Sequence, residues 1–127
     1  MSRRVLIADD DPRLVRVIEM YLAFEGFEVV TAVDGNEALV ELDKQCPDMV
    51  ILDIMMAGTD GIEVCARIRR NPRTARLPVI MFSALSSDHD VERARLAGAN
   101  HLITKPYNLA GLGVVVRSCF EGTQMAV

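Results

Sequence analysis

The feature that most constrains the fold is a regular alternation of short apolar runs with segments of helical periodicity. Five runs are rich in Val, Ile or Leu and too short for a helix: RVLIAD (4–9), FEVVTA (27–32), DMVILD (48–53), LPVIMFSA (77–84) and HLITK (101–105). Several are apolar at successive positions, which is typical of parallel strands covered on both faces. We therefore predict five βα units in one doubly wound α/β domain, with right-handed crossovers and helices on both faces of the sheet.

The segments between these runs carry signals for the start of a helix. Asp11 followed by Pro12 suits an N-cap and a first helical position. DGNE (34–37) and DGIE (60–63) have capping-box spacing. The other two helices are predicted to begin just after small polar residues, Ser86 or Ser87 and Asn108.

Length and charge exclude several classes of protein. The 127 residues fit one domain, and a net charge of −4 gives no general attraction for nucleic acid, so we expect no direct nucleic-acid binding. The apolar runs are far shorter than a membrane span, and the N-terminus lacks the cleavage site of a signal peptide. We expect a cytoplasmic domain over residues 1–121, followed by a disordered tail over 122–127.

The cysteines and histidines show no metal-binding pattern. Cys46, Cys65 and Cys119 are odd in number and far apart, within apolar or amphipathic segments. We predict buried free thiols for these three residues. His89 and His101 lack metal-ligand spacing with each other or with a cysteine, and both are predicted to lie on the surface.

Residues with reactive side chains collect where the predicted strands end. Three acids (9–11) follow the first strand, Asp53 ends the third, Ser83 the fourth and Lys105 the fifth. In doubly wound sheets the functional groups lie outside the carboxyl ends of the strands, at a topological switch point. If the first and third strands are neighbours, their ends lie about 5 Å apart. The carboxylates would then converge on one small volume.

Such a cluster is tolerable only if a cation neutralises it or some of the acids stay protonated. An all-oxygen site suits Mg²⁺ better than zinc or copper. The Lys105 ammonium and the Ser83 hydroxyl add two groups that can bind phosphoryl oxygens, and a carboxylate can act as the nucleophile that forms an aspartyl phosphate. Taken alone, DDDP (9–12) is explained equally well as an acid-rich helix N-terminus.

The joint pattern resembles the receiver domain of two-component response regulators, and the likeness covers essentially the whole chain. The resemblance implies that Asp9 and Asp10 bind Mg²⁺. It implies that Asp53, in a loop similar to the family's D-x-x-M-P-x-x-D-G, is the phosphoacceptor. Ser83 matches the family's hydroxyl residue, and Lys105 matches the lysine of its Lys-Pro step.

The same resemblance implies a flavodoxin-like sheet of strand order 2-1-3-4-5 and a metal ligand from the backbone carbonyl of Met55. Asp11 falls on a variable position and is kept as the helix cap. The implied activity is that of a signalling phosphoacceptor, which catalyses only its own Mg²⁺-dependent phosphoryl transfer and hydrolysis. The implied partners are a sensor histidine kinase or phosphotransfer domain, a downstream output domain or protein, and a second copy bound through the fourth and fifth helices.

Several positions depart from the family pattern. Ala57 replaces the usual proline and Thr59 a common methionine, so we expect a less rigid loop after the acceptor. Leu102 replaces the usual aromatic switch residue, so coupling is predicted to depend mainly on Ser83 and the fourth helix.

Residues beside the reactive groups are predicted to modulate the reaction. We assign this role to Ala84, Leu85 and Leu102. Met55 and Leu85 stand at the family's rim positions, and neither offers a hydrogen-bond acceptor strong enough to orient a hydrolytic water. The sequence therefore predicts a long-lived phosphorylated form.

Three other functions are weaker alternatives. A phosphatase of the haloacid-dehalogenase type needs a second acid two residues after its nucleophile, where this chain has Met55. A nucleotide-binding Rossmann domain needs a Gly-rich first turn, where this chain has ADDDP (8–12). A receiver used only for docking would not need the complete set of acids, serine and lysine.

Overall fold

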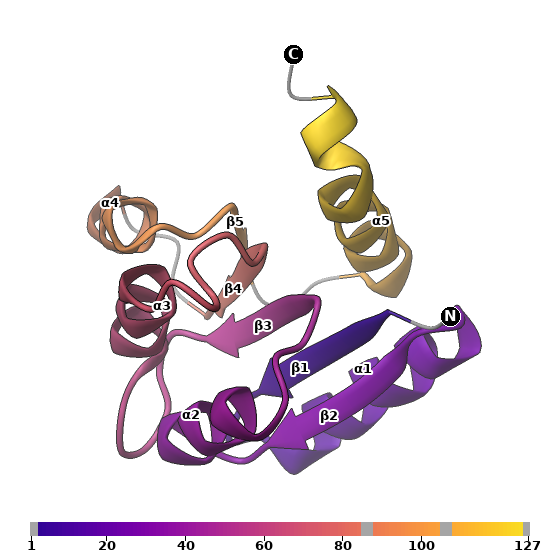
Figure 1. Ribbon diagram of the computed structural model, residues 1–127. Coiled ribbons are helices and arrows are strands. Elements are labelled where there is room, and N and C mark those ends of the chain that lie inside the picture. The colour runs from indigo at the N-terminus through magenta and orange to yellow at the C-terminus, as the bar shows by residue number, and fades with distance from the viewer. Residues whose placement is uncertain (1–2, 85–87, 105–107, 126–127) are drawn as a thin grey trace.

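The computed structural model describes residues 3–84, 88–104 and 108–125, with side chains described through residue 121 (Figure 1). The strands are β1 (Arg4–Ala8), β2 (Glu28–Ala32), β3 (Met49–Asp53), β4 (Val79–Ser83) and β5 (His101–Thr104). The helices are α1 (Pro12–Phe24), α2 (Gly35–Lys44), α3 (Gly61–Arg70), α4 (Asp88–Ala97) and α5 (Leu109–Met125). Five βα units therefore follow one another, as the sequence predicted.

The strands form one parallel sheet of order β2-β1-β3-β4-β5, which confirms the predicted fold class and strand order. Ala8 of β1 pairs with Leu52 of β3. The residues that follow this pair, Asp9 and Asp53, therefore leave the sheet at the same level. The change of direction in strand order lies between β1 and β3, where a doubly wound sheet opens its functional cleft.

Each face of the sheet carries its own apolar core. Val5 and Ile7 of β1 pack in one cluster with α1 and α5, whereas Leu6 and Ala8 pack in the other with α2, α3 and α4. Figure 1 shows these two groups of helices on opposite sides of the sheet. Successive side chains of a strand point to opposite faces, so a strand covered on both sides must be apolar at every position. β3 and β4 are buried at every position and are apolar over 49–52 and 79–82, ahead of the polar residues Asp53 and Ser83 at their ends.

Acidic side chains cap three of the helices. Asp11 accepts hydrogen bonds from the backbone N–H groups of Arg13 (3.0 Å) and Leu14 (3.4 Å). Asp34 and Asp60 each accept one from the residue three positions later, at 2.8 and 2.9 Å. These bonds satisfy N–H groups that have no partner within the helix, and they confirm the three predicted caps.

The predictions for the last two helices and the C-terminal segment agree in part with the structure. α4 and α5 begin where the sequence predicted, but α5 extends to Met125, into the segment 122–127 that we expected to be a tail. The limit of the domain at residue 121 stays a prediction. Within the described residues, no helix combines the length and apolarity needed to cross a bilayer.

The three cysteines are free, as predicted, but only Cys65 is buried. Cys46 and Cys119 are half-buried, so the prediction of burial was wrong for these two. Cys119 packs against the edge of the core beneath α1 and α5, whereas Cys46 lies in the connection between α2 and β3. His89 and His101 are exposed, which confirms the prediction for the histidines.

The C-terminal end of α4 is attached to α3 through two side chains one helical turn apart. The Arg69 guanidinium donates to the carbonyl of Gly98 at 3.0 and 2.7 Å. It also donates to the carbonyls of Ala75 (3.1 Å) and Leu77 (2.6 Å). Burial raises the pKa of the Cys65 thiol, so the thiol stays protonated and donates to a carbonyl at the end of α4 (3.3 Å).

We expect Arg69→Met to lower the free energy of unfolding by about 2–3 kcal/mol, because hydrogen bonds from a charged donor are lost and partly buried carbonyls are left unsatisfied. Arg70→Met is the matched control, since Arg70 lies on the same helix and, in the described part of the chain, pairs with half-exposed Glu63. Its loss should cost less than about 1 kcal/mol. Urea unfolding of both variants measures the difference, and equal stabilities would contradict the structural role of Arg69.

Candidate functional site

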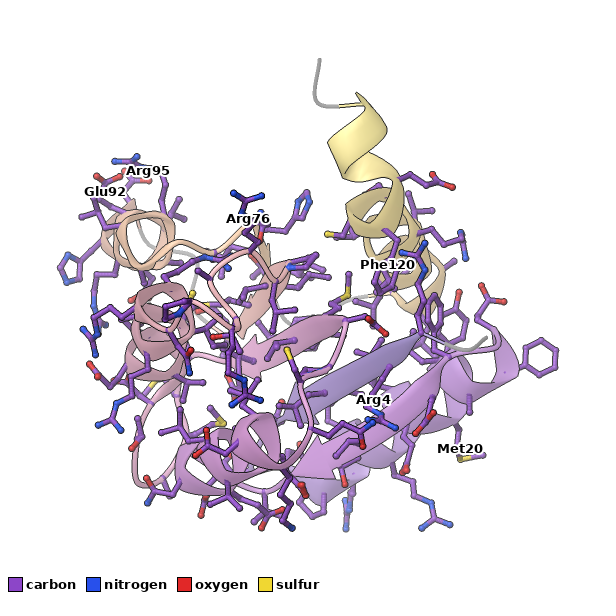
Figure 2. All side chains as sticks on the ribbon, viewed as in Figure 1. Arg4, Met20, Arg76, Glu92, Arg95 and Phe120 are labelled. Atoms are coloured by element: carbon purple, nitrogen blue, oxygen red, sulfur yellow. The ribbon has the colours of Figure 1, made fainter. Side chains whose placement is uncertain are left out.

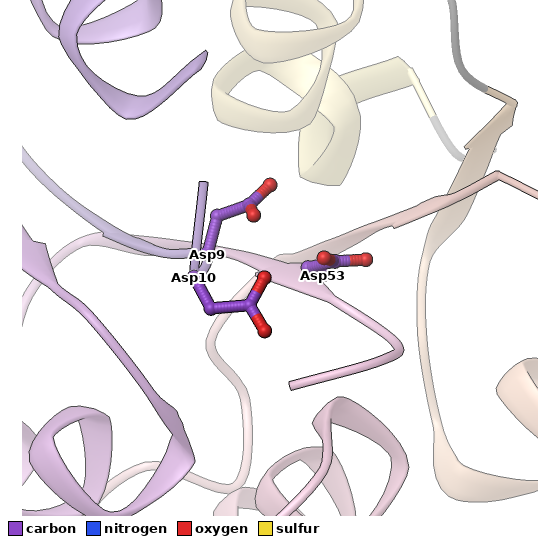
Figure 3. Close-up of side chains that lie close together, drawn as sticks. All are labelled: Asp9, Asp10 and Asp53. Atoms are coloured by element: carbon purple, nitrogen blue, oxygen red, sulfur yellow. The ribbon is translucent and has the colours of Figure 1, made fainter. Parts of the chain in front are cut away.

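Three carboxylates meet at the carboxyl end of the sheet. Asp9 and Asp10 follow β1 and Asp53 ends β3, and one oxygen of each lies within 4.8 Å of the others (Figure 3). Asp9 and Asp53 are 1% and 6% exposed, whereas Asp10 is open to solvent. The structure thus brings together the three acids that the sequence predicted to converge.

Local hydrogen bonds turn the chain at both strand ends. A carboxylate oxygen of Asp9 accepts from the N–H of Asp11 at 3.0 Å. The carboxylate of Asp53 accepts in the same way from the N–H of Met55 at 3.4 Å. A bond from an Asp side chain to the backbone two residues later is a turn that this residue type favours. Each acid therefore helps to fix the loop that positions it.

The cluster fits a hard divalent cation. Two carboxylates about 4 Å apart repel by roughly 4 kcal/mol at an effective dielectric constant near 20. Three in this space therefore favour a bound cation, and carboxylate oxygens are the ligands that Mg²⁺ prefers. Asp9, Asp10 and Asp53 are the residues that could hold it, and the backbone carbonyl of Met55 stays a predicted fourth ligand.

Backbone hydrogen bonds hold the loop between β3 and α3 at its start and at its end. The N–H of Ile54 donates to the carbonyl of Phe82 in β4 (2.9 Å), and the N–H of Gly61 donates to the carbonyl of Ile54 (2.9 Å). Further along the loop, the Thr59 hydroxyl donates to the Asn36 side chain of α2 at 2.6 Å. This bond attaches the loop to α2, and the less rigid loop that we expected from Ala57 and Thr59 stays a prediction.

Ser83 lies at the end of β4, buried next to the cluster, and pairs in register with Thr104 of β5. It lines a cavity of about 610 Å³ together with Asp10, Met55 and Asp60. Ala84, the next residue, is exposed. The structure thus places the predicted hydroxyl group at a cavity that also reaches the acid cluster.

Two of the predicted site residues, Lys105 and Leu85, lie outside the described residues. Their roles stay predictions. Leu102 lies within β5, pairs in register with Met81 and packs against the core beneath α2, α3 and α4.

Comparison with known proteins identifies the family. The profile of the response regulator receiver domain matches residues 5–117. The chain belongs to this family. The receiver domain is 39% identical to the response regulator PleD of Caulobacter vibrioides over 118 residues, which cover 93% of this chain and 26% of PleD.

Two further relatives support the same family. PhoB of Rhizobium meliloti, a phosphate regulon transcriptional regulatory protein, is 36% identical over 93% of this chain and 52% of its own length. The receiver domain of a Francisella response regulator superposes with a TM-score of 0.88 at 30% identity, covering 96% of this chain and 99% of that one. The receiver domain described here thus spans about a quarter of PleD and half of PhoB.

Two residues at the site of this receiver domain were missed by the sequence reasoning. Asp90 and Arg93 of α4 line the cavity that also contains Ser83 and Asp10. Asp90 lies one helical turn before buried Ala94, and this spacing could have placed Asp90 toward the inner face of α4, with Arg93 one turn further along.

Proposed function

We propose that the chain accepts a phosphoryl group on Asp53 from a histidine kinase or phosphotransfer domain, in a reaction that depends on Mg²⁺. The phosphorylated domain then changes conformation and signals to an output domain or protein. The observation that carries this proposal is the cluster of Asp9, Asp10 and Asp53 within 4.8 Å at the carboxyl end of the sheet. A signalling exchange with a histidine kinase also implies a cytoplasmic location.

In the proposed transfer, a carboxylate oxygen of Asp53 attacks the phosphorus of a phosphohistidine. The new O–P bond forms as the P–N bond breaks, and the imidazole leaves with the electron pair and takes up a proton. When bound, Mg²⁺ supplies positive charge that offsets the carboxylates and the phosphoryl oxygens. Asp9 and Asp10 would hold the ion, and the Ser83 hydroxyl would donate to a phosphoryl oxygen. Lys105 is proposed to pair with another phosphoryl oxygen.

Intact-mass measurement with acetyl phosphate and Mg²⁺ tests the proposal. We expect one added phosphoryl group on the wild type and none on Asp53→Asn or after addition of a chelator. Asp43→Asn is the matched control, because Asp43 is an exposed acid on α2 outside the cluster. Labelling of Asp53→Asn at the wild-type level would overturn the assignment of the acceptor.

The phosphorylated form is expected to be long-lived. Met55 is 69% exposed beside the acceptor and cannot orient a water for attack on phosphorus. We expect Met55→Asn to speed the loss of phosphate by about three- to tenfold, since orienting the water lowers the barrier by roughly 1 kcal/mol. Adding Leu85→Glu should speed the loss further.

Met20→Asn provides the control for this prediction, because Met20 is similarly exposed (63%) but lies on α1. Phosphate remaining after removal of the donor is followed over time. If Met55→Asn loses phosphate no faster than Met20→Asn, the lifetime is set by other groups.

A further inference from the structure

Two arginines of α4 have different environments. The Arg95 guanidinium donates two hydrogen bonds to the Glu92 carboxylate, at 3.0 and 2.6 Å, in a bidentate salt bridge on the outer side of the helix (Figure 2). Within the described part of the chain, Arg93 forms one ion pair, with Asp90 at 3.9 Å. That distance is too long for a hydrogen bond. Among the described residues, the Arg93 guanidinium therefore has no hydrogen-bond acceptor.

Arg93 faces the cavity next to the proposed acceptor. The described residues that line this cavity include three acids, Asp10, Asp60 and Asp90, and a single cation, Arg93. The carboxylate of Asp10 also belongs to the cluster with Asp53. The cavity therefore borders the acid cluster at Asp10, and an anion bound in it would lie among several negative charges.

We propose that Arg93 binds the anionic phosphoryl donor in this cavity before transfer. This inference rests on the proposed function and adds a residue that positions the donor. A guanidinium presents five N–H groups in a planar fork that matches phosphoryl oxygens, and those of Arg93 have no competing acceptor among the described residues. Asp90 keeps the guanidinium near the cavity without occupying its donors.

This role predicts an effect on donor capture more than on the chemical step. Arg93 adds attraction for the incoming anion, so its removal should raise the donor concentration that gives half of the maximal rate. We expect Arg93→Gln to raise that concentration about fivefold while the rate at saturating donor changes less than twofold. Because the attraction is electrostatic, added salt should slow the wild type more than the variant.

The experiment compares Arg93→Gln with Arg95→Gln, which removes the same charge from the same helix. Initial rates of phosphorylation by acetyl phosphate are measured by intact mass over a range of donor concentrations and at two salt concentrations. We expect the shift in Arg93→Gln alone, with partial rescue in Arg93→Lys, which keeps the charge but not the fork. Thermal unfolding checks that both glutamine variants are folded.

The outcomes separate this inference from the proposed function. Normal phosphorylation of the wild type with equal half-maximal concentrations in Arg93→Gln and Arg95→Gln overturns the role of Arg93 alone. A shift of the same size in both variants also overturns it, because a general charge effect would then be sufficient. Failure of the wild type to become phosphorylated overturns the proposed function, and the inference with it.

Discussion

Replacing Gly61 with alanine is expected to lower the free energy of unfolding by about 3 kcal/mol, because the side chain would overpack a closed site. A Cβ atom at Gly61 would lie 2.2 Å from the carbonyl oxygen of Asp53 and 3.0 Å from the Cα of Ile54. Both contacts are backbone atoms, which cannot rotate away. The end of β3 and the turn after Asp53 would have to move, so we also expect slower phosphorylation of Asp53 if it is the acceptor.

Gly111→Ala is the matched control for this prediction. Among the described residues, the nearest atom to a Cβ at Gly111 in α5 would be the Asn108 side-chain oxygen at 3.4 Å, an ordinary contact. Alanine also restricts the unfolded chain and favours helix, so this variant should be as stable as the wild type or slightly more stable. Urea unfolding and phosphorylation rates are measured for both. If Gly61→Ala is as stable as Gly111→Ala, then the close approach of Gly61 to the Asp53 backbone does not require glycine at position 61.

Replacing Asp10 with asparagine is expected to abolish the stabilisation of the protein by Mg²⁺. A cation that binds only the folded state raises its stability by about 1.4 kcal/mol at ten times its dissociation constant. Asp10→Asn removes one ligand charge from the cluster and relieves the repulsion among the three acids. The variant should therefore be more stable than the wild type without Mg²⁺ and gain little when Mg²⁺ is added.

Asp11→Asn removes the same charge one residue later. Asp11 caps α1 through the N–H groups of Arg13 and Leu14, and asparagine caps equally well. We expect Asp11→Asn to keep both its stability and its response to Mg²⁺. Thermal unfolding with and without Mg²⁺ distinguishes the two variants. An undiminished Mg²⁺ response in Asp10→Asn would place the metal elsewhere.

Much of the fold and part of the site followed from local sequence patterns. Apolar residues at every position of 49–52 required a strand covered on both faces, and Asp11, Asp34 and Asp60 marked helix starts that the structure contains. Asp9 and Asp53 each follow the apolar part of a predicted strand. Their proximity could be predicted from these positions once the two strands were assumed to be neighbours. Such features depend on residues close in sequence, or on rules that hold for any parallel sheet.

The contacts that the sequence did not predict join segments far apart in the chain. Arg69 reaches Gly98, 29 residues away, and no local pattern distinguishes it from Arg70, its exposed neighbour. The space available at Gly61 depends on the backbone of β3, and the place of Arg93 depends on how α4 packs beside the acid cluster. These properties are set by tertiary distances, which composition and periodicity do not contain.

We propose that Asp53 itself carries the phosphoryl group. Sodium borohydride reduces an acyl phosphate to an alcohol, so it should convert a phosphorylated Asp53 to homoserine after treatment with acetyl phosphate and Mg²⁺. Peptide mass spectrometry then locates the modified residue. We expect homoserine at position 53, and we expect it to depend on both the donor and the metal. Homoserine at Asp9 or Asp10 instead, or an unmodified peptide containing Asp53 in protein shown to carry the phosphoryl group, would contradict it.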